Sequence, residues 1–123
     1  MLHSSKKIGE IGEDIASNYL KSLGFLIICR NFRSKFGEID IIAKDDNTLV
    51  FVEVKTRRNE RFGAAVEQIT KDKQKRIMRV AKEYFRQYKG SVNYTRFDVV
   101  AINLLPDGNR NIHYIKRAFD RWR

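Results

Sequence analysis

The clearest pattern in the chain lies between residues 37 and 58, where two apolar, β-branched runs flank a short polar cluster. The runs cover residues 39–43 and 49–54, and the polar cluster covers residues 45–48. This pattern is typical of a β-hairpin with a tight turn. If Asp46 and Asn47 form a two-residue turn, directly opposed residues have numbers that add up to 93, so that Asp40 faces Glu53 and Glu38 faces Lys55.

Side chains alternate between the two faces of a strand, so the hairpin register also predicts which residues share a face. The first face carries Asp40, Ile42, Leu49, Phe51, Glu53 and Lys55, and the second carries Ile39, Ile41, Ala43, Val50, Val52 and Val54. Apart from the charged row, both faces are apolar. We therefore expect the hairpin to be central in a sheet that is covered on both sides.

The rest of the chain supplies two helical patterns and three further strands. Apolar residues recur at helical spacing over 6–23 and again over 66–89, the latter as one helix or in two parts with Thr70 capping the longer one. We predict a strand at 25–32, beside the hairpin, and another at 96–104. After a turn at 106–109, residues 111–116 are expected to form an edge strand. The segment after Lys55, residues 56–65, is expected to be a loop. The order α-β-β-β-α-β-β predicts a single α/β domain over 1–123, with a mixed sheet and a helix on each face.

Three small residues in the first predicted helix, Gly9, Gly12 and Ala16, are unusual. A glycine inside a helix is unfavourable by about 0.5–1 kcal/mol relative to alanine. They therefore suggest that this helix approaches the sheet or a functional site closely.

Charge is distributed unevenly along the 123 residues, whose formal net charge is +10. Residues 1–56 hold eight Lys/Arg and eight Asp/Glu, whereas residues 57–123 hold seventeen and seven. A one-sided basic excess is typical of a protein that binds nucleic acid or an anionic membrane. No lipid anchor or long apolar face accompanies it, so we expect nucleic acid and no membrane.

The remaining composition points to a soluble protein of the cytoplasm. No apolar run approaches the length of a membrane span, and the N-terminus has no secretory apolar region. The single cysteine, Cys29, excludes an intramolecular disulfide and lies in an apolar run, where we expect it to be a small core residue.

The charged row of the hairpin is the candidate for chemistry. Like charges that face each other across a sheet are destabilising, so Asp40 and Glu53 suggest that a cation lies between them. Hard divalent cations take such ligands, and Mg²⁺ is often held by one or two carboxylates plus phosphate and water. Lys55 could balance charge or help activate water, which predicts a metal-assisted phosphodiesterase site. The alternative is structural, with Lys55 merely paired to Glu38 or Glu53.

The residues of this hairpin also carry a resemblance to known proteins. Ile39-Asp40 followed by Glu53-Val54-Lys55 resembles the PD-(D/E)xK nuclease superfamily, with Ile39 where the motif has proline. The longer strings RNFRSKFGEIDIIA and LVFVEVKTR resemble the YraN-like family of endonuclease-like proteins, which is similar to archaeal Holliday-junction resolvases. The resemblance covers roughly residues 6–103.

The resemblance implies a restriction-endonuclease-like core and a metal-dependent endonuclease that hydrolyses DNA, with branched recombination structures as candidate substrates. Mg²⁺, with Mn²⁺ as a substitute, would be bound by Asp40, Glu53 and the Val54 carbonyl, and Lys55 would orient or deprotonate the attacking water. In resolvase-like relatives, a first-helix glutamate four residues after a glycine joins the metal site; Gly9 and Glu13 match this spacing, so the resemblance implies that Glu13 is the third acid of the site.

Further residues are candidates for contacts with the nucleic acid. Arg33 belongs to the resembling string, and several nuclease branches place a glutamine where Gln68 stands. The candidates are Arg33, Arg57, Arg58, Gln68, Lys73 and Arg76. Asp98 lies in a phrase, FDVVAI, that echoes EIDIIA, and we expect a structural role for it, with a role in the site as the alternative.

Two alternatives to a nuclease remain open. A catalytically silent nucleic-acid-binding module would bind in a salt-dependent way without cleaving, and an accessory subunit of a DNA-processing machine would have a dedicated protein interface. A homodimer is expected if the resolvase analogy holds, because a two-strand cut needs two sites.

Overall fold

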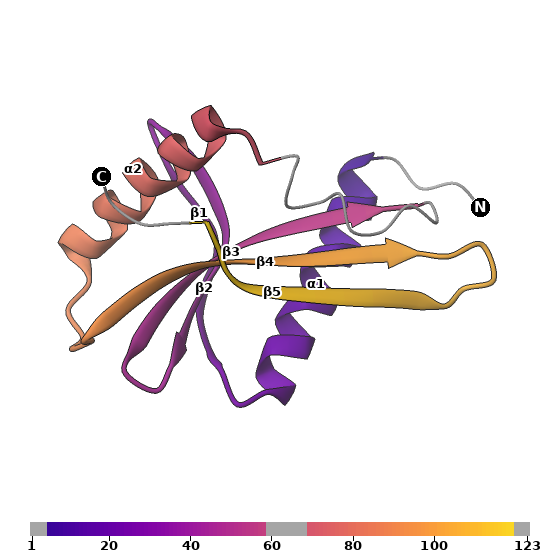
Figure 1. The fold of residues 1–123 in the computed structure, drawn as a ribbon, viewed down its shortest axis with the longest axis horizontal. Helices are drawn as coiled ribbons and strands as arrows, with labels where there is room; N and C mark the ends of the chain where they lie inside the picture. Colours follow the sequence, from indigo (N-terminus) through magenta and orange to yellow (C-terminus); the bar gives the residue numbers. More distant parts are fainter. Residues whose placement is uncertain (1–4, 59–68, 120–123) are drawn as a thin grey trace.

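The computed structural model describes residues 5–58 and 69–119 of the chain. Two helices and five strands follow one another in the predicted order (Figure 1). The elements are α1 (Ser5–Ser22), β1 (Leu26–Ser34), β2 (Gly37–Asp45), β3 (Thr48–Arg57), α2 (Lys71–Gln87), β4 (Tyr94–Leu104) and β5 (Arg110–Phe119).

The strands form one mixed sheet in the order β1-β2-β3-β4-β5. β3 and β4 are parallel, and every other neighbouring pair is antiparallel. A parallel pair needs a long crossover, which here contains α2. The predicted central hairpin is confirmed as β2–β3, and the architecture is the expected mixed α/β arrangement, consistent with a restriction-endonuclease-like core.

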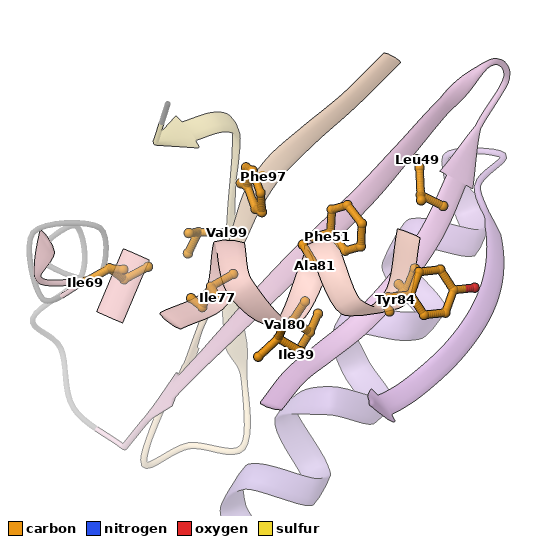
Figure 2. Close-up of a cluster of buried hydrophobic side chains, with 11 residues drawn as sticks. Ile39, Leu49, Phe51, Ile69, Ile77, Val80, Ala81, Tyr84, Phe97 and Val99 are labelled. Atoms are coloured by element: carbon orange, nitrogen blue, oxygen red, sulfur yellow. The ribbon is translucent and has the colours of Figure 1, made fainter. Parts of the chain in front are cut away.

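The two helices cover opposite faces of the sheet (Figure 1). α2 packs through Ile77, Val80 and Ala81 on a core that includes Phe51 and Phe97 (Figure 2). α1 packs through Ile15, Ala16 and Leu20 on the other face, against a core that includes Ile41, Val50, Val52 and Val100. Both sides of the hairpin are therefore covered, as its two apolar faces predicted.

The predicted hairpin register is correct from the turn as far as the Ile41–Val52 pair. Asp45 pairs with Thr48 and Ile41 with Val52, which places Asp46 and Asn47 in the turn. The predicted face of Ile39 is wrong, because Ile39 packs beneath α2 with Val80 rather than beside Ile41 (Figure 2).

The change of face coincides with an irregularity opposite Asp40. In β1, Arg30 pairs with Ile41 and Phe32 with Ile39, and Asn31 between them adopts a left-handed conformation with φ of 55°. The pairing between β2 and β3 ends next to Asp40, at the Ile41–Val52 pair. Asp40 therefore lies where β2 leaves β3.

Several element boundaries differ from the prediction. β3 continues through Thr56 and Arg57, which were expected in a loop, because they pair with Ile102 and Asn103 of the parallel strand β4. α2 begins after Thr70, whose side chain caps it by accepting the N–H of Lys73 at 3.1 Å, and ends at Gln87. Gln68 and the remainder of the predicted loop from residue 59 lie outside the described residues, as does the start of the predicted second helix.

The close approach predicted for α1 occurs at Gly12. A Cβ atom there would overlap Oγ1 of Thr56 on β3 and lie 2.8 Å from its Cβ. At Gly9 an added Cβ would meet no atom within 4 Å. Gly12, not Gly9, therefore sets how closely α1 lies on the strand that carries Glu53 and Lys55.

This difference predicts opposite effects of the same substitution at the two glycines. Gly12→Ala should lower the free energy of unfolding by about 1–3 kcal/mol, because the methyl group forces α1 away from Thr56. Gly9→Ala should raise it by up to about 1 kcal/mol, because alanine favours a helix and has room here. Urea denaturation of the two variants and the wild type measures both; equal effects of the two substitutions would contradict the close contact.

Candidate active site

The side chain of Asp40 makes a hydrogen bond to the backbone of β3 at the point where β2 and β3 separate. Its Oδ2 accepts the N–H of Val54 at 2.7 Å. Burial, followed by the negative charge of Glu53, raises the pKa of Asp40 to about 8, although the Val54 N–H partly opposes this. Near neutral pH, the carboxyl of Asp40 is therefore mostly protonated.

Glu53 is the second carboxylate and is only 8% exposed on β3. Its Oε2 lies 2.6 Å from Nζ of Lys73 and 3.6 Å from Nζ of Lys55. Asp40, Glu53, Lys55 and Lys73 thus form one group, which we call the acid–lysine cluster. Two ammonium groups balance two carboxyls that would otherwise be expensive to bury side by side.

The two lysines of the cluster differ in their readiness to lose a proton. Burial and the neighbouring Lys73 lower the pKa of Lys55, against the opposing effect of Glu53. Burial alone would also lower the pKa of Lys73. Its other interactions, first among them the hydrogen bond to Glu53, outweigh burial and raise this pKa above its usual value. Lys55 is therefore the better proton acceptor, and Lys73 stays cationic.

Lys73 has an ion-pair partner that the sequence did not predict. It was expected to contact the nucleic acid, and in the structure its Nζ pairs with Glu53. A signal for this was present, since Lys73 precedes the buried Ile77 by one helical turn and so lies on the inward-facing side of α2. Thr70 caps the same turn by accepting the backbone N–H of Lys73.

Two hollows open beside the cluster. One of about 260 Å³ is lined by Asp40, Glu53, Lys73 and Arg76, together with the turn at Phe36 and Gly37. The other, of about 370 Å³, is lined by Glu13, Val54, Lys55, Arg57 and Arg58. The hollows beside the acid–lysine cluster are therefore lined by Arg76 on one side and by Arg57 and Arg58 on the other.

Two further candidates lie near the cluster with partners of their own. Glu13 of α1 pairs with Arg30 at 3.7 Å, and its negative charge adds to the raised pKa of Asp40. Arg33 pairs with Glu38 at 3.4 Å. Glu38 lines the smaller hollow, and its ion pair places Arg33 next to the wall of that hollow.

The carboxyl oxygens of the cluster fit a hard divalent cation whose remaining ligands are phosphate and water. Among residues 5–58 and 69–119, no group of three or more His, Cys, Asp or Glu side chains could hold a metal. Asp40 and Glu53 nevertheless supply the one or two carboxylates that Mg²⁺ uses when phosphate and water complete its shell. In this structure, Lys73 competes for the Glu53 carboxylate.

Asp98 has the structural environment that was expected. It is fully buried, and both its carboxylate oxygens accept hydrogen bonds from Arg96, at 3.0 and 3.1 Å. The Tyr114 hydroxyl and the Arg117 N–H also donate to it. This network joins β4 to β5 on the face covered by α1.

Fold and cluster together define a small mixed α/β protein with paired carboxyls and lysines where two central strands diverge. The chain belongs to UPF0102, described as an uncharacterised protein family, whose model matches residues 12–102. A UPF0102 protein of Geotalea daltonii is 50% identical over 119 residues, covering 96% of this chain and 93% of its own. One of Dictyoglomus turgidum is 44% identical over 117 residues, covering 94% and 99%.

Neither described helix, α1 or α2, has the length and apolar character needed to span a membrane.

The raised pKa of Asp40 predicts how stability depends on pH. The unfolded carboxyl ionises near 3.8 and the folded one near 8, so the folded state loses relative stability as pH rises through this window. Asp40→Asn cannot ionise and its side-chain oxygen can still accept the Val54 N–H. It should therefore be more stable than the wild type by at least about 2 kcal/mol at pH 8.5, with the difference shrinking toward pH 4.

Chemical denaturation over this pH range, without divalent cations, measures the effect. Glu10→Gln, which removes an exposed carboxylate of α1, is the matched control and should leave the pH profile almost unchanged. Parallel pH profiles for the wild type and Asp40→Asn would show that Asp40 is not held protonated.

Proposed function

We propose that this protein is a metal-dependent nuclease that hydrolyses phosphodiester bonds of DNA. The observation that carries the proposal is the acid–lysine cluster, in which Asp40 and Glu53 lie together beside two lysines of unlike proton affinity. Membership in UPF0102 leaves the activity open, so the proposal rests on this group of side chains. The pattern of Asp40, Glu53 and Lys55 also supports assignment to the PD-(D/E)xK superfamily.

In this proposal, Asp40, Glu53 and the Val54 carbonyl hold Mg²⁺ or Mn²⁺, and Glu13 completes the acid cluster. A bound cation supplies charge stabilisation at the phosphodiester group. Lys55, whose pKa is lowered, orients water and accepts its proton at Nζ. Lys73 stays cationic and attracts the phosphate that enters the hollow beside it.

The basic residues around the cluster supply affinity without sequence information. Arg57 and Arg58 line one hollow and Arg76 the other, where each can hold phosphate oxygens. The solvent-exposed side of α2 adds Lys71, Lys75, Arg79, Lys82 and Arg86. Branched DNA as the preferred substrate, a homodimer and a cytoplasmic location come from the resemblance and the composition, and they belong to the same proposal.

Cleavage tests the proposal directly. With Mg²⁺ or Mn²⁺, the wild type should cut at least one of linear duplex, single-stranded, flapped and four-way-junction DNA. Glu53→Ala and Lys55→Ala should each reduce the rate by about 100-fold or more while DNA binding persists. Lys55→Arg should also be inactive, because arginine keeps the charge but does not accept a proton.

Lys21→Ala, which changes an exposed lysine at the end of α1, is the control and should keep full activity. Cleavage that survives in Glu53→Ala would assign the activity to another site or to a contaminant. Absence of cleavage on every substrate, with binding equal in all variants, would overturn the proposal.

One observation favours a second candidate, a catalytically silent nucleic-acid-binding module. Lys73 already lies 2.6 Å from Glu53, so the cluster can balance its charge without a cation. In this case the acid–lysine cluster joins α2 to the sheet, and the basic surface is the functional part.

Thermal unfolding in the presence of Mn²⁺ or Mg²⁺ distinguishes the two candidates without any activity assay. A nuclease site should raise the Tm of the wild type by about 4 °C at ten times Kd, because only the folded state binds the cation. Glu53→Ala should abolish this shift, whereas Lys21→Ala should retain it. Equal Tm values with and without cation at millimolar concentration favour the silent module.

A further inference from the structure

A third hollow, of about 500 Å³, lies at the far end of α2 from the acid–lysine cluster. Its volume is within the range of about 300–1,000 Å³ that is usual for binding pockets. Its lining residues come from the last turns of α2, from the segment that leads into β4 and from the first residues of β4. The lining residues used below are Lys82, Phe85, Arg86, Val92, Asn93 and Tyr94.

Two large aromatic side chains in this lining are exposed. Tyr94 is 68% exposed and Phe85 is 43% exposed. Their positions are held by regular structure, since Phe85 is on α2 and Tyr94 pairs with Thr48 of β3. The backbone N–H groups of Asn93 and Tyr94 also donate to the Asn47 carbonyl, at 2.9 and 3.2 Å. Exposed aromatic groups around a hollow, on a rigid support, mark a binding surface.

The charged residues of the hollow select the kind of ligand. Lys82 and Arg86 are the charged residues of its lining, and both are basic. Arg86 also pairs with Glu83 of the same helix at 3.2 Å. Aromatic rings beside basic side chains are the means by which proteins bind single-stranded nucleic acid, with bases stacked on the rings and phosphates held by the cations.

A basic ridge runs along the solvent-facing side of α2, away from the side that carries Lys73, and extends from this hollow toward the helix end that lies at the acid–lysine cluster. Exposed Lys75, Arg79, Lys82 and Arg86 follow one another at spacings of three or four residues, so they share one side of α2. Arg86 lies thirteen positions after Lys73, which corresponds to about 20 Å along a helix. A strand of several nucleotides, as in the footprints of other single-strand-binding domains, is long enough to follow the ridge from the hollow to the other end of the helix.

We propose that the hollow between α2 and β4 binds unpaired bases of a single-stranded segment whose phosphates follow the basic ridge of α2. The inference rests on the proposed action on DNA and makes it more specific. The preferred DNA then has a single-stranded portion, such as a flap or tail, next to the bond that is cut.

Fluorescence anisotropy in EDTA tests the proposal without cleavage. The probes are a fluorescein-labelled oligothymidine of about 15 nucleotides and a labelled duplex of equal length, at fixed salt because phosphate contacts are salt-dependent. Tyr94→Ala and Phe85→Ala should each weaken single-strand binding by about 10-fold, since stacking is lost, and should change duplex binding by less than about 2-fold.

Two control variants separate stacking from general damage. Tyr94→Phe keeps the ring and should bind the single strand like the wild type. Leu26→Ala removes a similarly exposed side chain, 63% accessible, from β1, an edge strand that two other strands separate from β4, and should have no effect on either probe.

The outcomes distinguish failure of this inference from failure of the proposed function. If both probes bind and Tyr94→Ala leaves single-strand affinity unchanged, the base-binding hollow is wrong and nuclease action remains possible. If neither probe binds the wild type at low salt, both proposals fail. A labelled polyglutamate peptide that binds the wild type but not Tyr94→Ala, while oligothymidine affinity is unchanged, would assign the hollow to an acidic protein partner and overturn the inference.

Discussion

The repulsion between two neighbouring carboxyls, Asp40 and Glu53, is the constraint on which the central part of the structure depends. Each group is largely removed from water, and both cannot be ionised there without compensation. Compensation comes from the proton that Asp40 holds near neutral pH, from Lys55 on the same strand as Glu53 and from Lys73 on α2. Because Lys73 belongs to the first turn of α2, the placement of that helix end on the sheet is coupled to the charge of the cluster. The apolar contacts of Ile77 and Val80 bury the helix, whereas the ion pair specifies where its first turn lies.

The irregular backbone around Asp40 follows from the same constraint. A regular ladder would place the Asp40 side chain opposite Glu53 and leave the Val54 N–H to a backbone carbonyl. Instead, the strands separate and the Asp40 carboxylate accepts that N–H. Opposite Asp40, Asn31 adopts φ of 55°, a conformation that asparagine tolerates better than most residues. Such local departures from regular geometry are often found at functional sites, where the surrounding structure holds them in place.

Local sequence patterns predicted the elements and the hairpin register, but not the contacts made between distant segments. The polar turn at Asp46 and Asn47 was sufficient to place Ile41 opposite Val52. The face of Ile39 was predicted incorrectly, because alternation assumes a regular strand and the left-handed conformation of Asn31 has no clear signal in the sequence. Arg57 was assigned to a loop because its parallel partner, Asn103, lies 46 residues later in the chain. The pairing of Lys73 with Glu53 was missed, although its place on the inward side of α2 could have indicated it.

The charge of the cluster also bears on how a polyanion would approach it. Two ionised carboxylates would repel a phosphate group, despite the basic residues that surround both hollows. Near neutral pH this repulsion is reduced in two ways, since Asp40 is mostly protonated and Lys73 neutralises Glu53. In the proposed nuclease, a divalent cation would take over both ways of reducing the repulsion. It would displace the proton of Asp40, and it would compete with Lys73 for Glu53. Cation binding would therefore release a proton, and the affinity for the cation would rise as pH approaches the pKa of Asp40, about 8. The lysine freed from Glu53 would then be available to the incoming phosphate, which reconciles the predicted phosphate contact of Lys73 with its observed position.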